Sequence, residues 1–177
     1  MANFVFCSEN KVPKVAKNEA AKIITLNSQL QLGLYGKKGT FDYVEDQGDF
    51  VAVIGYACFL KQESIAQTLS TILRSFSESH ITSLKKNLVG QFIMIIKKAQ
   101  ALYIFSDFCG CRNIFYSSTD LILSSSFAQM ESMLDTNSDS VNESKVFEYL
   151  AMRYIIFPTW LGRDTMHNSI KWLLPHE

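Results

Sequence analysis

The chain has 177 residues and a mass of 20.1 kDa, the size of one domain. Seventeen Lys and Arg residues balance seventeen Asp and Glu residues, which excludes a polybasic binder of nucleic acid or of membrane surfaces. Apolar residues make up 47% of the chain, enough to bury a core. We expect a single domain over residues 1–177, without a signal peptide or membrane span, in the cytoplasm.

The first 45 residues give the weakest pattern, and their glycines Gly33, Gly36 and Gly39 predict loops. No GK[ST] ending follows these glycines, so a phosphate-binding loop is not expected there. Further on, continuous apolar runs predict strands covered on both faces, at residues 50–59, 92–96, 102–105 and 121–123. Residues 91–97 and 102–107 are too close for a helical crossover, so they should pair antiparallel.

Two capping boxes predict helix starts. Ser64 with Gln67 precedes an apolar stripe at helical spacing, formed by Ile65, Leu69, Ile72, Leu73 and Phe76. Ser140 with Glu143 precedes a second such stripe. A shorter helix is expected over residues 127–134, followed by a loop over residues 135–139.

Four cysteines and three histidines offer little metal chemistry. Cys109 and Cys111 form a C-x-C pair, which matches neither a zinc half-site nor a redox C-x-x-C motif. We therefore expect no metal site and interpret the thiols as reduced and buried or half-buried, at Cys7, Cys58, Cys109 and Cys111.

Residues 88–125 carry a series of short motifs in a fixed order. Leu88-Val-Gly-Gln-Phe-Ile-Met-Ile-Ile96 resembles an L-x-G-x-F-A-F strand, and Leu102-Tyr-Ile-Phe-Ser-Asp-Phe-Cys-Gly110 resembles an L-x-L-x-R-D-x-x-G turn. Ile114-Phe-Tyr116 then matches P-L-Y-Y, and Leu121-Ile-Leu-Ser-Ser125 matches l-x-F-A-S. These are the motifs of class II glutamine amidotransferases, which the chain resembles.

The C-terminal residues extend this resemblance to the glutaminase domain of asparagine synthetase-like enzymes. Phe147-Glu-Tyr-Leu150 and Ser169-Ile-Lys-Trp-Leu-Leu-Pro-His176 are similar to the family's "eyL" and "I-x-x-L-p-P-G-h" segments. The resemblance implies an α+β fold of the N-terminal-nucleophile hydrolase type, a four-layer αββα sandwich of two antiparallel sheets. It also implies a following ATP-pyrophosphatase domain that uses ammonia from glutamine. The chain stops where that domain would begin, so we expect a fragment of a longer protein.

The residues that the family needs for glutamine hydrolysis are replaced here. The family's nucleophilic cysteine follows the initiator Met, where this chain has Ala2, and Cys7 would become terminal only after cleavage. The arginine that clamps the substrate carboxylate is missing, because the first arginine is Arg74. Ile54 stands in place of the asparagine that stabilises the oxyanion. The resemblance therefore implies no catalytic residue and a vestigial pocket near Ile54, Gly55 and Tyr56.

Other polar residues have structural interpretations. Glu63 imitates the charge of a residue that binds the substrate amino group in the family, whereas Ser106 replaces a family arginine. Asp107 and Gly110 match the family's turn, in which the aspartate braces the loop. The serines at 124–126 lack a G-x-S-x-G elbow and fit a strand end and helix cap. Trp160 and Trp172 are expected to pack against a following domain.

In lacking these residues the chain resembles β-lactam synthetases and lasso-peptide macrolactam synthetases, enzymes that need no ammonia and whose glutaminase half has lost its activity. We expect a non-catalytic glutaminase-like module of an ATP-dependent amide-forming enzyme. Its expected partner is a C-terminal synthetase domain or a separate subunit, either of which would hold ATP and Mg. We expect no cofactor in this chain. A homodimer is an alternative assembly. One alternative is a glutamine-hydrolysing asparagine synthetase domain with a misassigned start. Another is a stand-alone binding or scaffold protein on the same fold.

Overall fold

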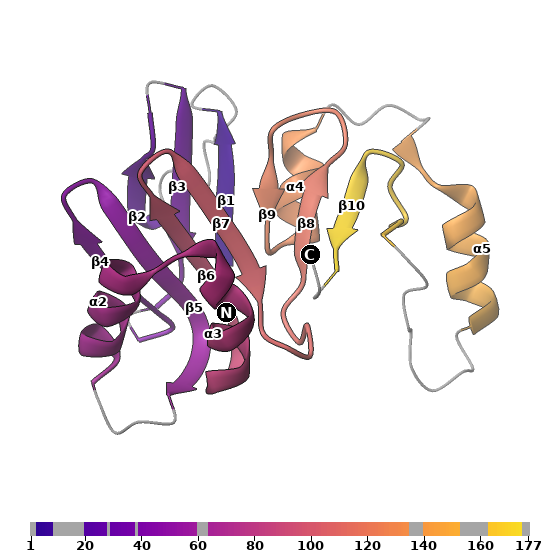
Figure 1. The fold of residues 1–177 in the computed structure, drawn as a ribbon. Helices are drawn as coiled ribbons and strands as arrows, with labels where there is room; N and C mark the ends of the chain where they lie inside the picture. Colours follow the sequence, from indigo (N-terminus) through magenta and orange to yellow (C-terminus); the bar gives the residue numbers. More distant parts are fainter. Residues whose placement is uncertain are drawn as a thin grey trace. The chain divides into compact units, whose positions relative to one another are not determined.

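The computed structural model describes residues 3–8, 20–27, 29–37, 39–59, 64–134, 140–152 and 163–174 (Figure 1). Within these residues the chain forms two compact units. One unit is built mainly from residues 34–112, and the other from residues 4–33 and 113–174. Each unit contains one antiparallel sheet, so the described chain has an α+β fold.

A four-stranded sheet forms the unit of residues 34–112, in the order β4-β5-β6-β7. Its strands are β4 (Phe41–Asp46), β5 (Asp49–Phe59), β6 (Leu88–Lys98) and β7 (Ala101–Ser106). All three pairings are antiparallel, which confirms the expected pairing of residues 91–97 with 102–107. The connection between β5 and β6 carries α2 (Ile65–Ser75), the short helix η2 (Glu78–His80) and α3 (Ile81–Asn87).

Two short turns fix the register of this sheet. Asp46 pairs with Asp49 across a two-residue turn in which Gln47 and Gly48 both have positive φ, at 50° and 85°. This backbone suits the right-handed twist of a hairpin. Lys98 pairs with Ala101 across the second turn, where Ala99 has φ 53°. The Asp49 carboxylate accepts the Ala99 N–H at 2.7 Å and meets Lys98 Nζ at 3.2 Å, which joins the two turns.

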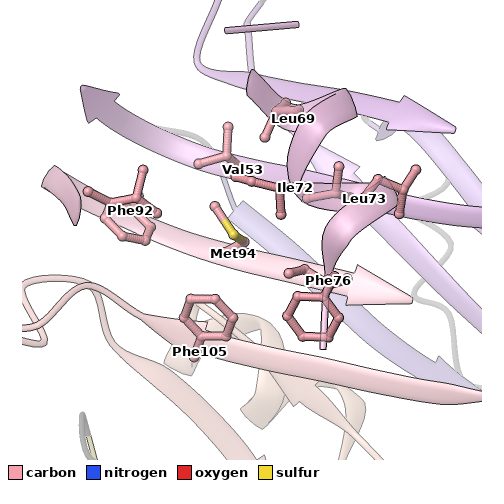
Figure 2. Close-up of a cluster of buried hydrophobic side chains, with 11 residues drawn as sticks. Val53, Leu69, Ile72, Leu73, Phe76, Phe92, Met94 and Phe105 are labelled. Carbon is pink, nitrogen blue, oxygen red and sulfur yellow. The ribbon is translucent and has the colours of Figure 1, made fainter. Parts of the chain in front are cut away.

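Buried side chains pack between this sheet and α2 (Figure 2). The strands contribute Val51, Val53, Leu88, Phe92, Met94, Ile96 and Phe105, and the helical connection contributes Leu69, Ile72, Leu73 and Phe76. The Phe76 and Tyr103 rings meet edge to face at 4.9 Å between centroids. Burying this many aliphatic and aromatic groups is the main favourable term in folding of the unit.

The opposite face of β5 and β6 is buried as well. Its residues are Phe50, Ala52, Ile54, Ile93 and Ile95, none of them more than 2% exposed. Both faces of the two central strands are therefore covered, as their continuous apolar sequence predicts.

The predicted capping box at the start of α2 is confirmed. Ser64 Oγ accepts the Gln67 N–H at 3.3 Å, and Gln67 Oε1 accepts the Ser64 N–H at 3.2 Å. Leu69, Ile72 and Leu73 are buried on the predicted apolar stripe, whereas Ile65 is 40% exposed. No pattern in the sequence predicts α3, which has no side-chain cap and no buried residue.

A six-stranded sheet forms the second unit, in the order β10-β8-β9-β1-β3-β2. Its strands are β1 (Asn3–Ser8), β2 (Ala20–Thr25), β3 (Leu30–Tyr35), β8 (Ile114–Ser117), β9 (Leu123–Ser124) and β10 (Ile170–Leu173). Two expectations need correction here. Gly33 lies within β3 and not in a loop, and the strand expected at residues 121–123 is only β9, which begins at Leu123.

Helices α4 (Phe127–Met133) and α5 (Glu143–Met152) also belong to this unit. The helix expected at residues 127–134 is confirmed. The capping box expected at Ser140 and Glu143 is wrong, because α5 begins two residues later than the box requires. Asn142 Oδ1 accepts the Lys145 N–H at 3.3 Å, so Asn142 is the side chain that caps the helix. The loop expected at 135–139 lies outside the described residues.

No helix among the described residues is long and apolar enough to cross a membrane.

Candidate functional site

The residues of the predicted vestigial pocket, Ile54, Gly55 and Tyr56, lie where β5 runs past the end of β4. The register of β4 with β5 ends at Phe41 and Ile54, and from Gly55 onward β5 pairs only with β6. The Ile54 side chain is fully buried, whereas Tyr56 is 71% exposed. Gly55 between them has φ 102° and donates its N–H to the Thr40 carbonyl at 2.9 Å.

Arg112 lies against this strand end, a contact that the sequence analysis missed. A Cβ on Gly55 would come within 2.6 Å of Arg112 Nε and would also meet the Gln91 carbonyl oxygen. Only a residue without a side chain allows the half-buried guanidinium to approach the backbone so closely. Ile54, Gly55, Tyr56, Asp107 and Arg112 together are called the strand-end site.

Sheet register explains how residues 55 and 112 meet. Gly55 pairs with Phe92, and the Phe92 carbonyl accepts the Asp107 N–H at 3.0 Å. Strand β7 ends at Ser106, so the loop that begins at Asp107 starts beside Phe92, the strand partner of Gly55. The predicted pairing of residues 91–97 with 102–107 was the signal that could have located Arg112 near this strand end.

Asp107 holds the loop of residues 107–112 in place. Its side chain is 3% exposed, and Oδ1 accepts the N–H groups of Cys109 and Cys111, each at 3.1 Å. The Gly110 N–H donates to the Asp107 carbonyl at 3.0 Å, and Gly110 has φ 62°. This is the arrangement expected of an aspartate that organises a turn. Asp107 Oδ2 is buried and accepts no hydrogen bond from the described residues.

The carboxylate of Asp107 influences two neighbouring groups. Partial desolvation, the Asp107 charge and the Cys109 thiol raise the pKa of Cys111. Desolvation lowers the pKa of Lys85, and the Asp107 charge opposes that shift. Lys85 Nζ also lies 5.5 Å from the centre of the Phe105 ring. The buried Asp107 carboxylate and the partly buried Lys85 ammonium therefore both contribute to the electrostatic potential at this loop.

Cys7 and the serine run are placed in the second unit. Cys7 is on β1 and fully buried. Ser124 Oγ donates to the Phe4 carbonyl at 2.9 Å, and Ser125 Oγ accepts the Phe4 N–H at 3.0 Å. Ser126 caps α4 by accepting the Gln129 N–H at 3.4 Å. The serines thus fill the strand-end and capping roles that the sequence predicts for them.

A pocket lies wholly within this unit. It is an apolar pocket of about 160 Å³ lined by Asn113, Phe115, Phe127, Thr165, Met166 and Trp172. Phe115 and Phe127 meet edge to face at 5.6 Å, and Trp172 pairs with Phe115 in the sheet. An apolar space of about this size holds one small ring. The expected contact of Trp172 with a following domain stays a prediction.

The expectation of buried or half-buried thiols is correct only for Cys7. Cys58, Cys109 and Cys111 are exposed. Cys58 extends from β5 beyond the end of β4, and the other two lie in the loop after β7, where turn geometry and not core packing sets exposure. Among the described residues, no group of three or more His, Cys, Asp or Glu could hold a metal ion.

Three residues named in the sequence analysis, Ala2, Glu63 and Trp160, lie outside the described residues. Comparison of the chain with protein-family models, with curated proteins and with solved structures found no match.

Proposed function

We propose that the chain is a non-catalytic glutaminase-like module of an ATP-dependent amide-forming enzyme that does not use ammonia from glutamine. One observation carries the proposal: neither the Ile54 side chain nor the Gly55 N–H is available as a donor to an oxyanion. The Ile54 side chain is apolar and buried, and the Gly55 N–H is already bonded to the Thr40 carbonyl at 2.9 Å. Stabilising a tetrahedral oxyanion needs donors aimed at it within a site that excludes water.

The nucleophile side of the reaction supports the same proposal. Cys7 is fully buried within β1, and thiol attack on an amide needs an accessible thiolate with a base in reach. The exposed thiols lie on β5, at Cys58, and in the loop of residues 107–112, at Cys109 and Cys111. The Cys7 thiol on β1 is inaccessible.

The arrangement of the sheets is part of the proposal. Two antiparallel sheets, with both faces of β5 and β6 buried, support a four-layer αββα sandwich of the N-terminal-nucleophile hydrolase type. The proposed module works in the cytoplasm.

Exposed apolar side chains on α5 support a docking role. Phe147 is 70% exposed and Leu150 is 53% exposed, with Tyr149 between them at 45%. Apolar surface of this kind marks contacts with other proteins or domains. We assign it to the ATP-binding partner, either a following synthetase domain or a separate subunit that holds ATP and Mg²⁺.

The test uses the native protein, captured from its own cells with an antibody against this chain. The expected result is a chain much heavier than 20.1 kDa, or the 20.1 kDa chain with an ATP-binding subunit. In either case the captured material should catalyse exchange of pyrophosphate into ATP. A 20.1 kDa chain alone, without exchange activity, would contradict the proposal.

A further inference from the structure

The loop of residues 107–112 presents two thiols to solvent with one residue between them. Cys109 and Cys111 are both exposed, and Phe108 beside them is 71% exposed. The loop is held by the Gly110 N–H to Asp107 carbonyl bond at 3.0 Å and by two N–H bonds to Asp107 Oδ1 at 3.1 Å. The thiols are therefore accessible groups on an ordered turn.

The turn places Cys109 and Cys111 on either side of a bend at Gly110. Gly110 between them has φ 62°, a conformation that bends the chain and that glycine adopts without strain. The Asp107 carboxylate and the Cys109 thiol are both close enough to Cys111 to raise the pKa of its thiol. A disulfide requires two cysteines whose Cα atoms are about 4.4 to 6.8 Å apart with Cβ atoms directed toward each other. The Cα atoms of residues two apart in a bend lie within about this range, so a bond between Cys109 and Cys111 requires their Cβ atoms to turn toward each other.

We propose that Cys109 and Cys111 form a redox-active dithiol that reacts with low-molecular-weight disulfides of the glutathione class. The Cys109 thiolate attacks one sulfur of the disulfide, forms a mixed disulfide and releases one small thiolate. The Cys111 thiolate then attacks Cys109 Sγ, closes the intraloop disulfide and releases the second small thiolate. The protein dithiol is oxidised and the small disulfide is reduced to two thiols, so two electrons and two protons balance.

The surroundings of Cys111 set the order of these steps. Partial desolvation and the Asp107 charge raise the pKa of Cys111, so its thiolate is scarcer than that of an ordinary cysteine, and only a thiolate attacks a disulfide. The first attack therefore falls to Cys109, and Cys111 is the resolving thiol. Ring closure over a single residue strains the bond, so the disulfide is easily reduced and the site is reversible. This chemistry does not depend on the proposed function.

The experiment incubates the isolated chain with excess oxidised glutathione and follows its intact mass after acid quenching, with peptide mapping of the bonded cysteines. In the wild type, the peptide that contains Cys109 and Cys111 should lose the mass of two hydrogen atoms, whatever glutathione adds at the exposed Cys58. A Cys7→Ser/Cys58→Ser double variant is the matched control, and it should form the same bond. Circular dichroism verifies that each variant is folded.

The single variants separate the two roles. Cys111→Ser should accumulate a glutathione adduct at Cys109 that persists about tenfold or longer than the wild-type intermediate, because no resolving thiol remains. Cys109→Ser should take up glutathione at residue 111 more slowly than Cys111→Ser does at residue 109. A folded wild type that remains fully reduced, or that retains a stable glutathione adduct at Cys109, would overturn the proposal.

Discussion

Gly55 shows how one residue shapes the strand-end site. Its φ of 102° disfavours any side chain, and a Cβ there would also press against Arg112 Nε at 2.6 Å and the Gln91 carbonyl oxygen. Two separate costs therefore act at this position, backbone strain and crowding against a backbone atom that cannot move freely.

Replacing Gly55 with Ala should lower the free energy of unfolding by about 2 to 4 kcal/mol, measured by urea denaturation. The matched control is Gly48→Ala, where φ is 85° but a Cβ would meet nothing within 4 Å. That variant incurs only the backbone strain and should lose about 1 kcal/mol. Equal losses at the two positions would show that Arg112 and Gln91 do not crowd Gly55.

Asp107 should control how Cys111 reacts. Asp107→Asn keeps the shape of the side chain and removes its charge, so the pKa of Cys111 should fall toward the ordinary value and its thiolate should be more abundant at neutral pH. Alkylation of Cys111 by iodoacetamide, followed by peptide mapping, should be several-fold faster than in the wild type. Asp49→Asn, which changes a carboxylate in the β4–β5 turn, should leave the Cys111 rate unchanged.

At the scale of single elements, α2 depends on its first residue. Ser64→Ala removes both hydroxyl contacts of the capping box and should lower the free energy of unfolding by about 1 kcal/mol, measured by urea denaturation. Ser70→Ala is the control, because the Ser70 hydroxyl only bonds back to the Ala66 carbonyl on the exposed side of the same helix. A similar loss from both variants would mean that the cap does not determine where α2 begins.

The two turns of the four-stranded sheet are linked by a carboxylate with a lowered pKa. The Ala99 N–H lowers the pKa of Asp49 most, and Lys98 adds to the shift, while partial desolvation opposes both. A carboxyl whose pKa is lower in the folded state stabilises the fold above its unfolded pKa, near 3.9. That stabilisation is lost as the pH falls through the lowered value.

Stability of the wild type should therefore fall between about pH 5 and pH 2 by more than that of Asp49→Asn, measured as urea midpoints across that range. Asp164→Asn is the variant with which Asp49→Asn is compared, because the pKa of Asp164 is also lowered, by Lys171 and in the second unit. Identical pH profiles of wild type and Asp49→Asn would contradict a stabilising role for the bond to Ala99.

Elements with a local signal were predictable, and those that depend on distant partners were not. The continuous apolar sequences of β5, β6 and β7 predict these strands. Ser64 and Gln67 form a capping-box motif that predicts the start of α2. Gly33 reads as a loop residue, yet sheet pairing places it in β3. At α5, Asn142 and Ser140 are both good caps by composition, and only the structure shows that Asn142 accepts the N–H.

The strand-end site was predictable in part for the same reason. Ile54 and Asp107 could be identified by motif, and the antiparallel register places both near Gly55. Arg112 is distant in sequence, and it reaches Gly55 because the loop after β7 is held by Asp107 Oδ1. Likewise, the apolar character of cysteine predicts that Cys109 and Cys111 are buried, but the shape of that loop exposes them.

For the whole molecule, the central proposal is that this fold no longer hydrolyses glutamine. In this proposal, Ile54 supplies no donor to the oxyanion and the buried Cys7 supplies no nucleophile, so restoring one of these alone should not restore activity. The exposed apolar groups on α5 are proposed to serve docking.

The most direct measurement of this proposal is ammonia release from glutamine by the purified chain, coupled to an ammonia-consuming dehydrogenase and run beside Cys7→Ala. The account predicts no release above the rate without protein, and no difference between wild type and variant. A clear rate that Cys7→Ala abolishes would contradict it, because Cys7 would then act as the nucleophile of a working glutaminase.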